Sequence, residues 1–131
     1  DHPIFTIGDH NGDLRTDPPL QGVRDNFVDT LDVAAKRLTG AEAVAFENNR
    51  ATHAYFPDGA PPKYQQLDAI CFTRGSNCEK FVVNAQVEPY RDGAGNPMGN
   101  PATKGARDQL PSDHRLLWMT LDFAKLFSLK K

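Results

Sequence analysis

The stretch from Leu116 to Phe123 constrains the fold most, because its side chains are apolar on both faces of an extended strand. One face carries Leu117, Met119, Leu121 and Phe123. The other face carries Leu116 and Trp118. A strand with two apolar faces has to be covered on both sides. The sequence therefore predicts an interior strand of a layered fold.

Length and charge narrow the class of protein further. A chain of 131 residues fits one ordinary domain with a modest core. Charges of both signs are spread along the chain and the formal net charge is -2, so no basic stripe indicates a nucleic-acid surface. No apolar run approaches the roughly 18 residues of a membrane-spanning helix. We therefore expect no transmembrane segment.

Two segments near the start of the chain have clear periodicity. Ile4–Ile7 is a short apolar run followed by Gly8, which predicts a buried strand that ends in a turn. Apolar residues recur at helical spacing between the candidate cap Asp25 and the stop signal Gly40. These residues are Phe27, Leu31, Ala34 or Ala35, and Leu38. They predict the clearest helix of the chain.

The middle of the chain has shorter patterns. Residues 43–46 and 51–56 flank a polar turn and predict two short strands or irregular segments. Residues 67–73 and 81–87 are richer in branched and aromatic side chains, and a turn-forming tetrapeptide with Gly and Asn lies between them. We expect these two segments to form a hairpin-like pair.

Two cysteines, Cys71 and Cys78, lie near that turn. They form either a small disulfide loop, as in an oxidising compartment, or two unrelated buried thiols. Their spacing differs from that of a CxxC pair and the chain has no second pair, so a structural zinc site is not expected.

An acidic cluster follows the first strand. Asp9, Asn11 and Asp13 alternate as in the opening of a calcium-binding loop, but Leu14 and Leu20 occupy the positions of the turn glycine and the bidentate glutamate. An EF-hand is therefore excluded. Asp9 and Asn11 either project into a crevice at the strand end, where open sheets place ligands, or belong to an Asx-rich turn.

A polar triplet separates a long loop from the apolar strand near the C-terminus. Residues 88–111 carry Gly and Pro repeatedly, and such a long irregular segment is usually functional or mobile. Ser112-Asp113-His114 follows directly, where side chains are held rigidly and still reach solvent. A histidine exchanges protons near neutral pH, which makes the triplet a catalytic candidate. A capped strand start is the structural alternative.

Asp68 is a lone acid in the apolar segment Leu67-Asp68-Ala69-Ile70. An unpaired carboxylate is costly in such a strand, so Asp68 needs a partner. His114 is the first candidate, and Lys63 or Arg74 could neutralise Asp68 in a purely structural arrangement.

Three blocks of the sequence resemble, in order and rough spacing, those of the endonuclease/exonuclease/phosphatase superfamily. They are Ile7-Gly8-Asp9-His10-Asn11, Leu67-Asp68-Ala69-Ile70 and Ser112-Asp113-His114. This chain has His10 where the family usually has Phe or Met, and Ala69 where it usually has Tyr. Each block alone is unspecific, whereas the ordered set spans nearly the whole chain and indicates the superfamily.

The resemblance implies a fold and a position within it. The family fold is a four-layer α/β sandwich of two similar halves, called DNase I-like. Residues 1–131 would be a single α+β domain, the C-terminal half of that larger hydrolase domain, with a mixed β-sheet and a flanking helix. The principal metal-binding Glu and a partnering Asn belong to the N-terminal half, which would be a separate chain or a removed segment. Such a half would expose a sheet face, so we expect association or poor solubility.

The resemblance also implies a role for each candidate residue. Asp68 would orient His114 in a catalytic dyad, Asp9 would activate or orient the attacking water, and Asn11 would hold a phosphate oxygen. Asp113, with Asp9 and Asn11, would lie on the metal side of the site. There Mg²⁺, or another divalent cation such as Mn²⁺, would act as a Lewis acid while water attacks in line.

Residues 38–68 look most like the secreted neutral sphingomyelinases of bacteria. The resemblance lies in Leu38-Thr39-Gly40, Tyr55-Phe56-Pro57-Asp58-Gly59, Tyr64 and Leu67-Asp68. It implies a secreted or periplasmic phosphodiesterase that converts sphingomyelin to ceramide and phosphocholine.

Two alternatives stay open. The membrane-inserting aromatic hairpin of those enzymes has no counterpart between Tyr90 and Pro111, so a secreted endonuclease or nucleotide phosphatase is the first alternative. A catalytically silent binding fragment is an alternative of another class, because the metal-binding Glu of the first half is missing.

Overall fold

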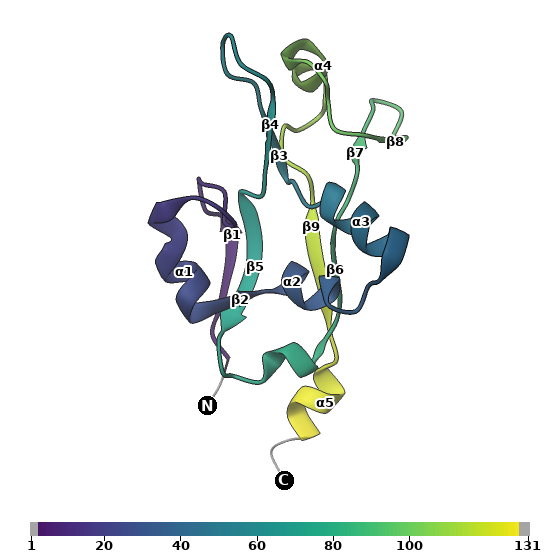
Figure 1. The fold of residues 1–131 in the computed structure, drawn as a ribbon. Coiled ribbons are helices and arrows are strands. Elements are labelled where there is room, and N and C mark those ends of the chain that lie inside the picture. The colour runs from purple at the N-terminus through teal and green to yellow at the C-terminus, as the bar shows by residue number, and fades with distance from the viewer. Residues whose placement is uncertain (1–2, 129–131) are drawn as a thin grey trace.

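The computed structural model describes residues 3–128, in which four small antiparallel sheets and several short helices form an α+β fold (Figure 1). The largest sheet has the strand order β1–β5–β2: Phe5–Asp9, Asp68–Thr73 and Phe27–Asp29. A second long pair is β6–β9: Val82–Val87 and Leu117–Leu121. Two short ribbons pair β3 with β4 and β7 with β8: His53–Tyr55, Lys63–Gln65, Tyr90–Arg91 and Pro97–Met98. The α+β class is thus confirmed, with separate antiparallel sheets in place of one mixed sheet.

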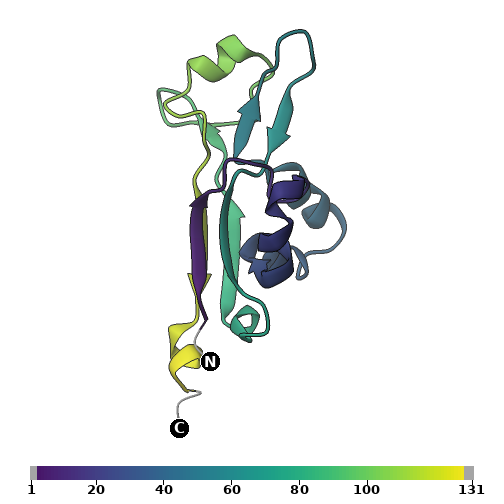
Figure 2. The ribbon, with the colours of Figure 1, turned by 90° about the vertical axis from the view of Figure 1, so that its left-hand side faces the viewer.

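The helices are short and lie mainly on one side of the strands. They are α1 (Gln21–Asn26), α2 (Thr30–Ala35), α3 (Gly40–Asn48), α4 (Lys104–Asp108) and α5 (Phe123–Ser128), with 3₁₀ turns at Pro18–Leu20 and Cys78–Lys80. Figure 2 shows α1, α2 and α3 on one side of the long strands, α4 at the upper end and α5 at the lower end. Within residues 3–128, no helix covers the opposite side of the strands, and none is long and apolar enough to cross a bilayer.

The core lies around β5, whose four central residues are all buried. On one face, Phe72 packs with residues of β2, α2 and β6, including Val28, Val33 and Val82. On the other face, Ala69 and Cys71 pack against Leu14. Because both faces of β5 are covered, its first residue is held in a fixed position at the rim of the sheet.

The first strand is longer and more exposed than the sequence predicts. β1 continues through Gly8, whose φ of 138° is a conformation that side-chain-bearing residues rarely adopt. Ile4 and Ile7 are 64% and 68% exposed, so the expectation of a buried strand ending at Gly8 is wrong. The strand ends at Asp9, which is therefore part of the sheet.

The single helix expected between Asp25 and Gly40 is also wrong. A helix ends at Asn26, and Phe27 starts β2, which pairs with β5. The next helix begins at Thr30, because the Asp29 side chain accepts a hydrogen bond from the Leu31 N–H at 3.0 Å. Pairing with β5 thus overrides the helical spacing of the apolar residues.

Residues 43–46 lie inside α3, so the expected strand or irregular segment is wrong there, whereas residues 53–55 of the second segment form β3. The two segments at 67–73 and 81–87 form strands, but they do not form a hairpin. β5 pairs with β1 and β2, and β6 pairs with β9. Cys71 and Cys78 are free, buried thiols in two different core clusters.

In the C-terminal part, residues 88–111 are more ordered than the sequence predicts, and the strand that follows is less buried. The segment 88–111 contains the β7–β8 ribbon and α4, so it is not a structureless loop. β9 is half-buried: Leu117, Met119 and Leu121 pack against the core, whereas Leu116 is 67% exposed. The prediction of an interior strand covered on both faces is therefore wrong in the described part of the chain.

Candidate functional site

The pairing of β1 with β5 brings two of the acidic candidates together. Asp9 lies directly opposite Asp68 in the register of this pair. The pairing extends one step further, because the His10 N–H donates to the Leu67 carbonyl at 2.9 Å. The start of β5 is fixed from the other side by Thr52, whose buried hydroxyl accepts from the Leu67 and Asp68 N–H groups at 3.0 Å each.

Backbone contacts bring the polar triplet to the same place. His114 forms a β-bridge with His53, and the Arg115 N–H donates to the Thr52 carbonyl at 2.7 Å. The Tyr90 hydroxyl donates to the Asp113 carbonyl at 3.0 Å. These contacts hold the triplet at the end of the β3–β4 ribbon, beside the start of β5.

The resulting side-chain contact joins His114 to Asp68. His114 Nδ1 lies 2.7 Å from Asp68 Oδ2, and the two side chains are 31% and 22% exposed. Lys63 and Arg74, the alternative partners, have no such contact with Asp68 within residues 3–128. Arg74 instead donates to the carbonyls of residues 24, 25 and 27. Asp68, the lone carboxylate of an apolar strand, is therefore paired with His114.

This contact changes the basicity of His114. Burial of the ring lowers the pKa of His114, but the hydrogen bond and charge of Asp68, with smaller contributions from Asp113 and Asp9, outweigh burial. The pKa of His114 is therefore raised above its ordinary value. A hydrogen bond to Nδ1 also leaves Nε2 as the ring nitrogen that can accept or deliver a proton.

His53 is a further neighbour of the His114–Asp68 pair. Its Nε2 lies 3.7 Å from Asp113 Oδ2, and its ring centroid lies 4.9 Å from that of His114. Burial and the neighbouring His114 charge lower the pKa of His53 below its ordinary value, although Asp113 acts in the opposite direction. A lone histidine between Thr52 and Ala54 has no pattern in the sequence that would mark it as functional.

The acidic cluster after β1 forms the Asx-rich turn that is one of its two interpretations. The Asn11 N–H donates to Asp9 Oδ1 at 2.7 Å, and Asn11 has a φ of 52°. The Arg15 N–H donates to Asp13 Oδ1 at 2.9 Å. The turn leaves Asp9 and Asn11 exposed, and the charge of Asp9 still acts on both His53 and His114. Of the two interpretations, the structure thus shows the Asx-rich turn.

The metal ligands expected from the sequence are brought together only in part. Within the described chain, one donor group contains Asp113, and its partners are His53 and His114 instead of Asp9 and Asn11. The carboxylates of Asp9 and Asp113 nevertheless act on the same two rings. Mg²⁺ is commonly held by one or two carboxylates with water and substrate phosphate filling the other positions. Two exposed carboxylates beside His114 fit this mode.

A pocket of about 240 Å³ borders His114 on the side of the β7 strand. Its walls include apolar side chains, among them Pro89, Tyr90, Pro111 and Leu116, together with the buried Arg115. A substrate with an apolar portion next to its phosphate could therefore contact His114 from this side.

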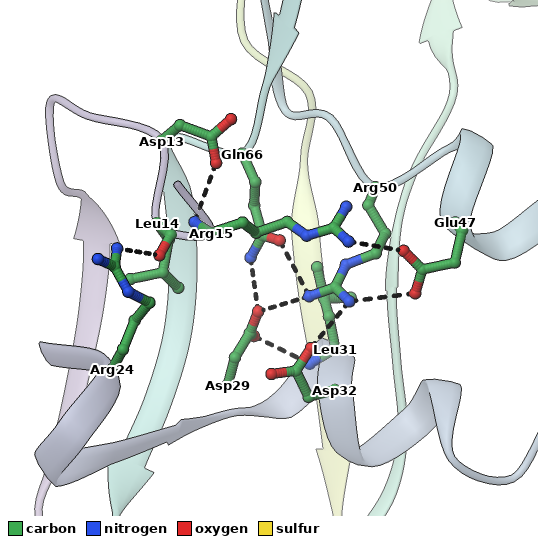
Figure 3. Close-up of polar contacts among 10 residues, drawn as sticks. All are labelled: Asp13, Leu14, Arg15, Arg24, Asp29, Leu31, Asp32, Glu47, Arg50 and Gln66. Carbon is green, nitrogen blue, oxygen red and sulfur yellow. Dashed lines mark hydrogen bonds and ion pairs between the residues drawn. The ribbon is translucent and has the colours of Figure 1, made fainter. Parts of the chain in front are cut away.

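A network of ion pairs and hydrogen bonds surrounds the buried Arg50 and was not indicated by the sequence (Figure 3). Arg50, whose side chain is 5% exposed, donates to Asp29 Oδ2 at 2.9 Å and to Gln66 Oε1 at 3.1 Å. Gln66 Nε2 donates to the same Asp29 oxygen at 2.7 Å. Further ion pairs join Arg50 to Asp32 and Glu47 at 2.8 and 3.2 Å. The network connects β2, α2 and α3 to a residue two positions before Asp68.

Comparisons of the chain with protein-family models, with curated proteins and with solved structures each give no match. The membership in a superfamily that the three sequence blocks indicate thus stays a prediction. A function for this chain has to be supported by the geometry around Asp68 and His114.

Proposed function

We propose that the chain is a divalent-metal-dependent phosphodiester hydrolase in which His114, oriented by Asp68, transfers the proton. The single observation that carries this proposal is the 2.7 Å contact between His114 Nδ1 and Asp68 Oδ2, on a half-buried ring that solvent still reaches. A carboxylate bonded to one nitrogen fixes the tautomer of a histidine and stabilises its charged form, which is what general acid–base catalysis needs.

The carboxylates on either side of the dyad supply the other roles. Asp9 lies opposite Asp68 across the strand pair and orients the attacking water, and Asn11 next to it contacts a phosphate oxygen. Asp113 and Asp9 would hold the divalent ion, Mg²⁺ with Mn²⁺ as its substitute. When bound, the ion supplies Lewis-acid stabilisation of the charge that develops on the phosphoryl group.

For the substrate we propose sphingomyelin, which is cut to ceramide and phosphocholine. Two observations favour a lipid over a nucleic acid. The net charge of -2 provides no basic surface for a polyanion. In addition, Tyr55, Tyr64 and Met98, which belong to β3, β4 and β8, are 40–46% exposed, and Figure 1 shows these three strands towards the upper end of the molecule. Such side chains suit contact with a lipid surface. As a protein of this type, the chain would act outside the cytoplasm, secreted or periplasmic.

Parallel hydrolysis assays test this proposal. Folded chain is incubated with sphingomyelin vesicles or with plasmid DNA, in Mg²⁺ or in a chelator. We expect release of phosphocholine in Mg²⁺ only, intact DNA, and a loss of about 100-fold or more in His114→Ala. Because His114→Ala also leaves the Asp68 carboxylate without its partner, the melting temperature is measured beside the rate, and the comparison is made at a temperature at which the variant is folded.

The other outcomes identify the alternatives. Cleavage of DNA without phosphocholine release would replace the lipid substrate by a nuclease activity of the same chemistry. No hydrolysis of either substrate by a folded chain in Mg²⁺ or Mn²⁺ would contradict the proposed reaction and favour a catalytically silent binding fragment.

A further inference from the structure

We propose that His53, Asp113 and His114 form a binding site for a transition-metal ion, with Zn²⁺ as the ion of choice. One ligand atom from each of these side chains lies within 4.8 Å of the other two. In this ligand set, two imidazoles replace oxygen donors that Mg²⁺ requires. The site is therefore different in chemistry from the carboxylate pair proposed for hydrolysis, although Asp113 belongs to both.

The backbone holds the two histidines next to each other before any ion binds. The β-bridge between His53 and His114 fixes their main chains side by side, and the Arg115 N–H bond to the Thr52 carbonyl at 2.7 Å continues this pairing. The rings are 4.9 Å apart between centroids. The Tyr90 hydroxyl fixes the main chain of Asp113 at 3.0 Å. Two of the three ligands are therefore preorganised by strand-like contacts.

Asp68 acts as the outer partner of the site. A histidine that binds a metal usually donates its second ring N–H to a carboxylate, which orients the ring and strengthens the ligand. His114 Nδ1 already has this contact, at 2.7 Å from Asp68 Oδ2. Nε2 of His114 is then the nitrogen left for an ion, on the same ring that faces His53.

The donor set selects the type of ion. Two imidazoles and one carboxylate are a common ligand set of open zinc sites, in which a water molecule takes the fourth position. Mg²⁺ prefers oxygen donors and dehydrates reluctantly. With metal–nitrogen distances of about 2.0–2.1 Å, tetrahedral ligands lie roughly 3.3 Å apart, so the group has to contract slightly. The side chain of Asp113 is 56% exposed and is free to make this movement.

The surrounding charges mostly favour a cation. Asp9 and Asp68 add negative charge next to the three ligands. Arg107 of α4 is the positive group that faces His53, and its guanidinium is paired with Asp108 at 2.7 Å. The balance of charge around the ligands is therefore negative.

Zinc at this site has a consequence for hydrolysis, and this consequence rests on the proposed function. An ion on His114 Nε2 occupies the lone pair that would accept the proton, and it also takes the Asp113 carboxylate away from Mg²⁺. Zn²⁺ is therefore expected to inhibit the Mg²⁺-supported reaction, whereas binding of zinc itself does not depend on any activity.

Zinc affinity is measured by competition with a chromophoric zinc chelator, with circular dichroism to verify folding. We expect the chain to bind one Zn²⁺ and to bind Mg²⁺ far more weakly. His53→Ala and Asp113→Asn each weaken zinc binding by at least about tenfold, and Asp68→Asn does so by roughly 10-fold to 100-fold. His10→Ala and Asp58→Asn are matched controls, because these residues lie outside the ligand group, and they keep the parental affinity.

Either of two results overturns the proposal: no competition with the chelator by the folded parent chain, or zinc binding that survives both His53→Ala and Asp113→Asn. Asp113→Asn keeps the test decisive if His53→Ala does not fold, because Asp113 is mostly exposed. Hydrolysis in Mg²⁺ without zinc is measured separately. Zinc binding without hydrolysis contradicts the proposed function alone, and hydrolysis without zinc binding contradicts this site alone. With both present, His53→Ala reduces the fraction of activity that zinc removes.

Discussion

At the scale of single residues, burial and partners decide which side chains of this chain can react. Burial, together with the charges of Asp29 and Asp32, raises the pKa of the Cys71 thiol to about 12. The pKa of Cys78 is also raised, mainly by burial and then by Glu79. His114, in contrast, keeps a third of its side chain exposed beside Asp68. His114 is therefore accessible for proton exchange, whereas the thiols are packing residues.

The thiols provide the first prediction. At pH 8 only roughly one Cys71 in ten thousand is a thiolate, so a thiol-specific reagent should leave both cysteines unmodified in the folded chain. In denaturant, both should react within minutes. Rapid modification of either cysteine in native buffer would show that the thiols are not buried as the structure places them.

Part of the site follows from the sequence at this scale. Asp68 could be assigned a partner because a lone carboxylate in an apolar strand is costly, and His114 was the best available base. His53 could not be found in this way, because an isolated histidine in a short segment carries no periodicity. Its position depends on the β-bridge to His114, which joins residues far apart in the chain.

At the scale of elements, the Arg50 network connects α2 and α3 to β2 and to the segment that precedes β5. Burial alone would lower the pKa of Arg50, but Asp29, Asp32 and Glu47 outweigh it, so the guanidinium stays charged. Asp29 also caps α2 and accepts from Gln66. One buried cation therefore fixes a helix start and the chain that leads into β5.

Arg50→Ala should lower the free energy of unfolding by about 3–5 kcal/mol, because it leaves the carboxylate of Asp29 buried without its cation. Arg15→Ala is the matched control. Arg15 pairs with Glu47 at 3.1 Å, but these side chains are 49% and 41% exposed, so its loss should cost at most about 1 kcal/mol. Urea unfolding measures both, and equal destabilisation by the two variants would argue against a stabilising network.

Strand identity could be predicted from the sequence better than strand pairing. β5, β6 and most of β9 follow from runs of branched and aromatic residues, which depend on local composition. Their partners depend on contacts between distant segments, and the short turn between β5 and β6 wrongly indicated a hairpin. α3 does have a local signal, because its three alanines and two glutamates favour a helix.

At the scale of the whole molecule, one side of the long strands has no helical cover within residues 3–128 (Figure 2). Ile7 on β1 and Leu116 just before β9 are 68% and 67% exposed. Exposed apolar side chains of this size are unfavourable in water and promote association. Because both faces of the central strand β5 are buried, association through an exposed sheet face stays a prediction.

Sedimentation velocity should therefore show self-association of the chain that increases with concentration. The double variant Ile7→Lys/Leu116→Lys should shift the distribution towards the monomer. Val44→Lys is the control, since Val44 is 62% exposed but lies on α3, on the helical side. A parent chain that stays monomeric over the same range, or an equal effect of Val44→Lys, would be inconsistent with association through the uncovered side.

The most direct test of the proposed chemistry is a double-mutant cycle on the hydrolysis rate in Mg²⁺, with Asp68→Asn, His114→Ala and the combination. If Asp68 acts only by orienting His114, the double variant should be no slower than His114→Ala, because the two side chains work as one unit. If the two losses instead multiply, Asp68 and His114 contribute independently. That result would contradict the catalytic dyad.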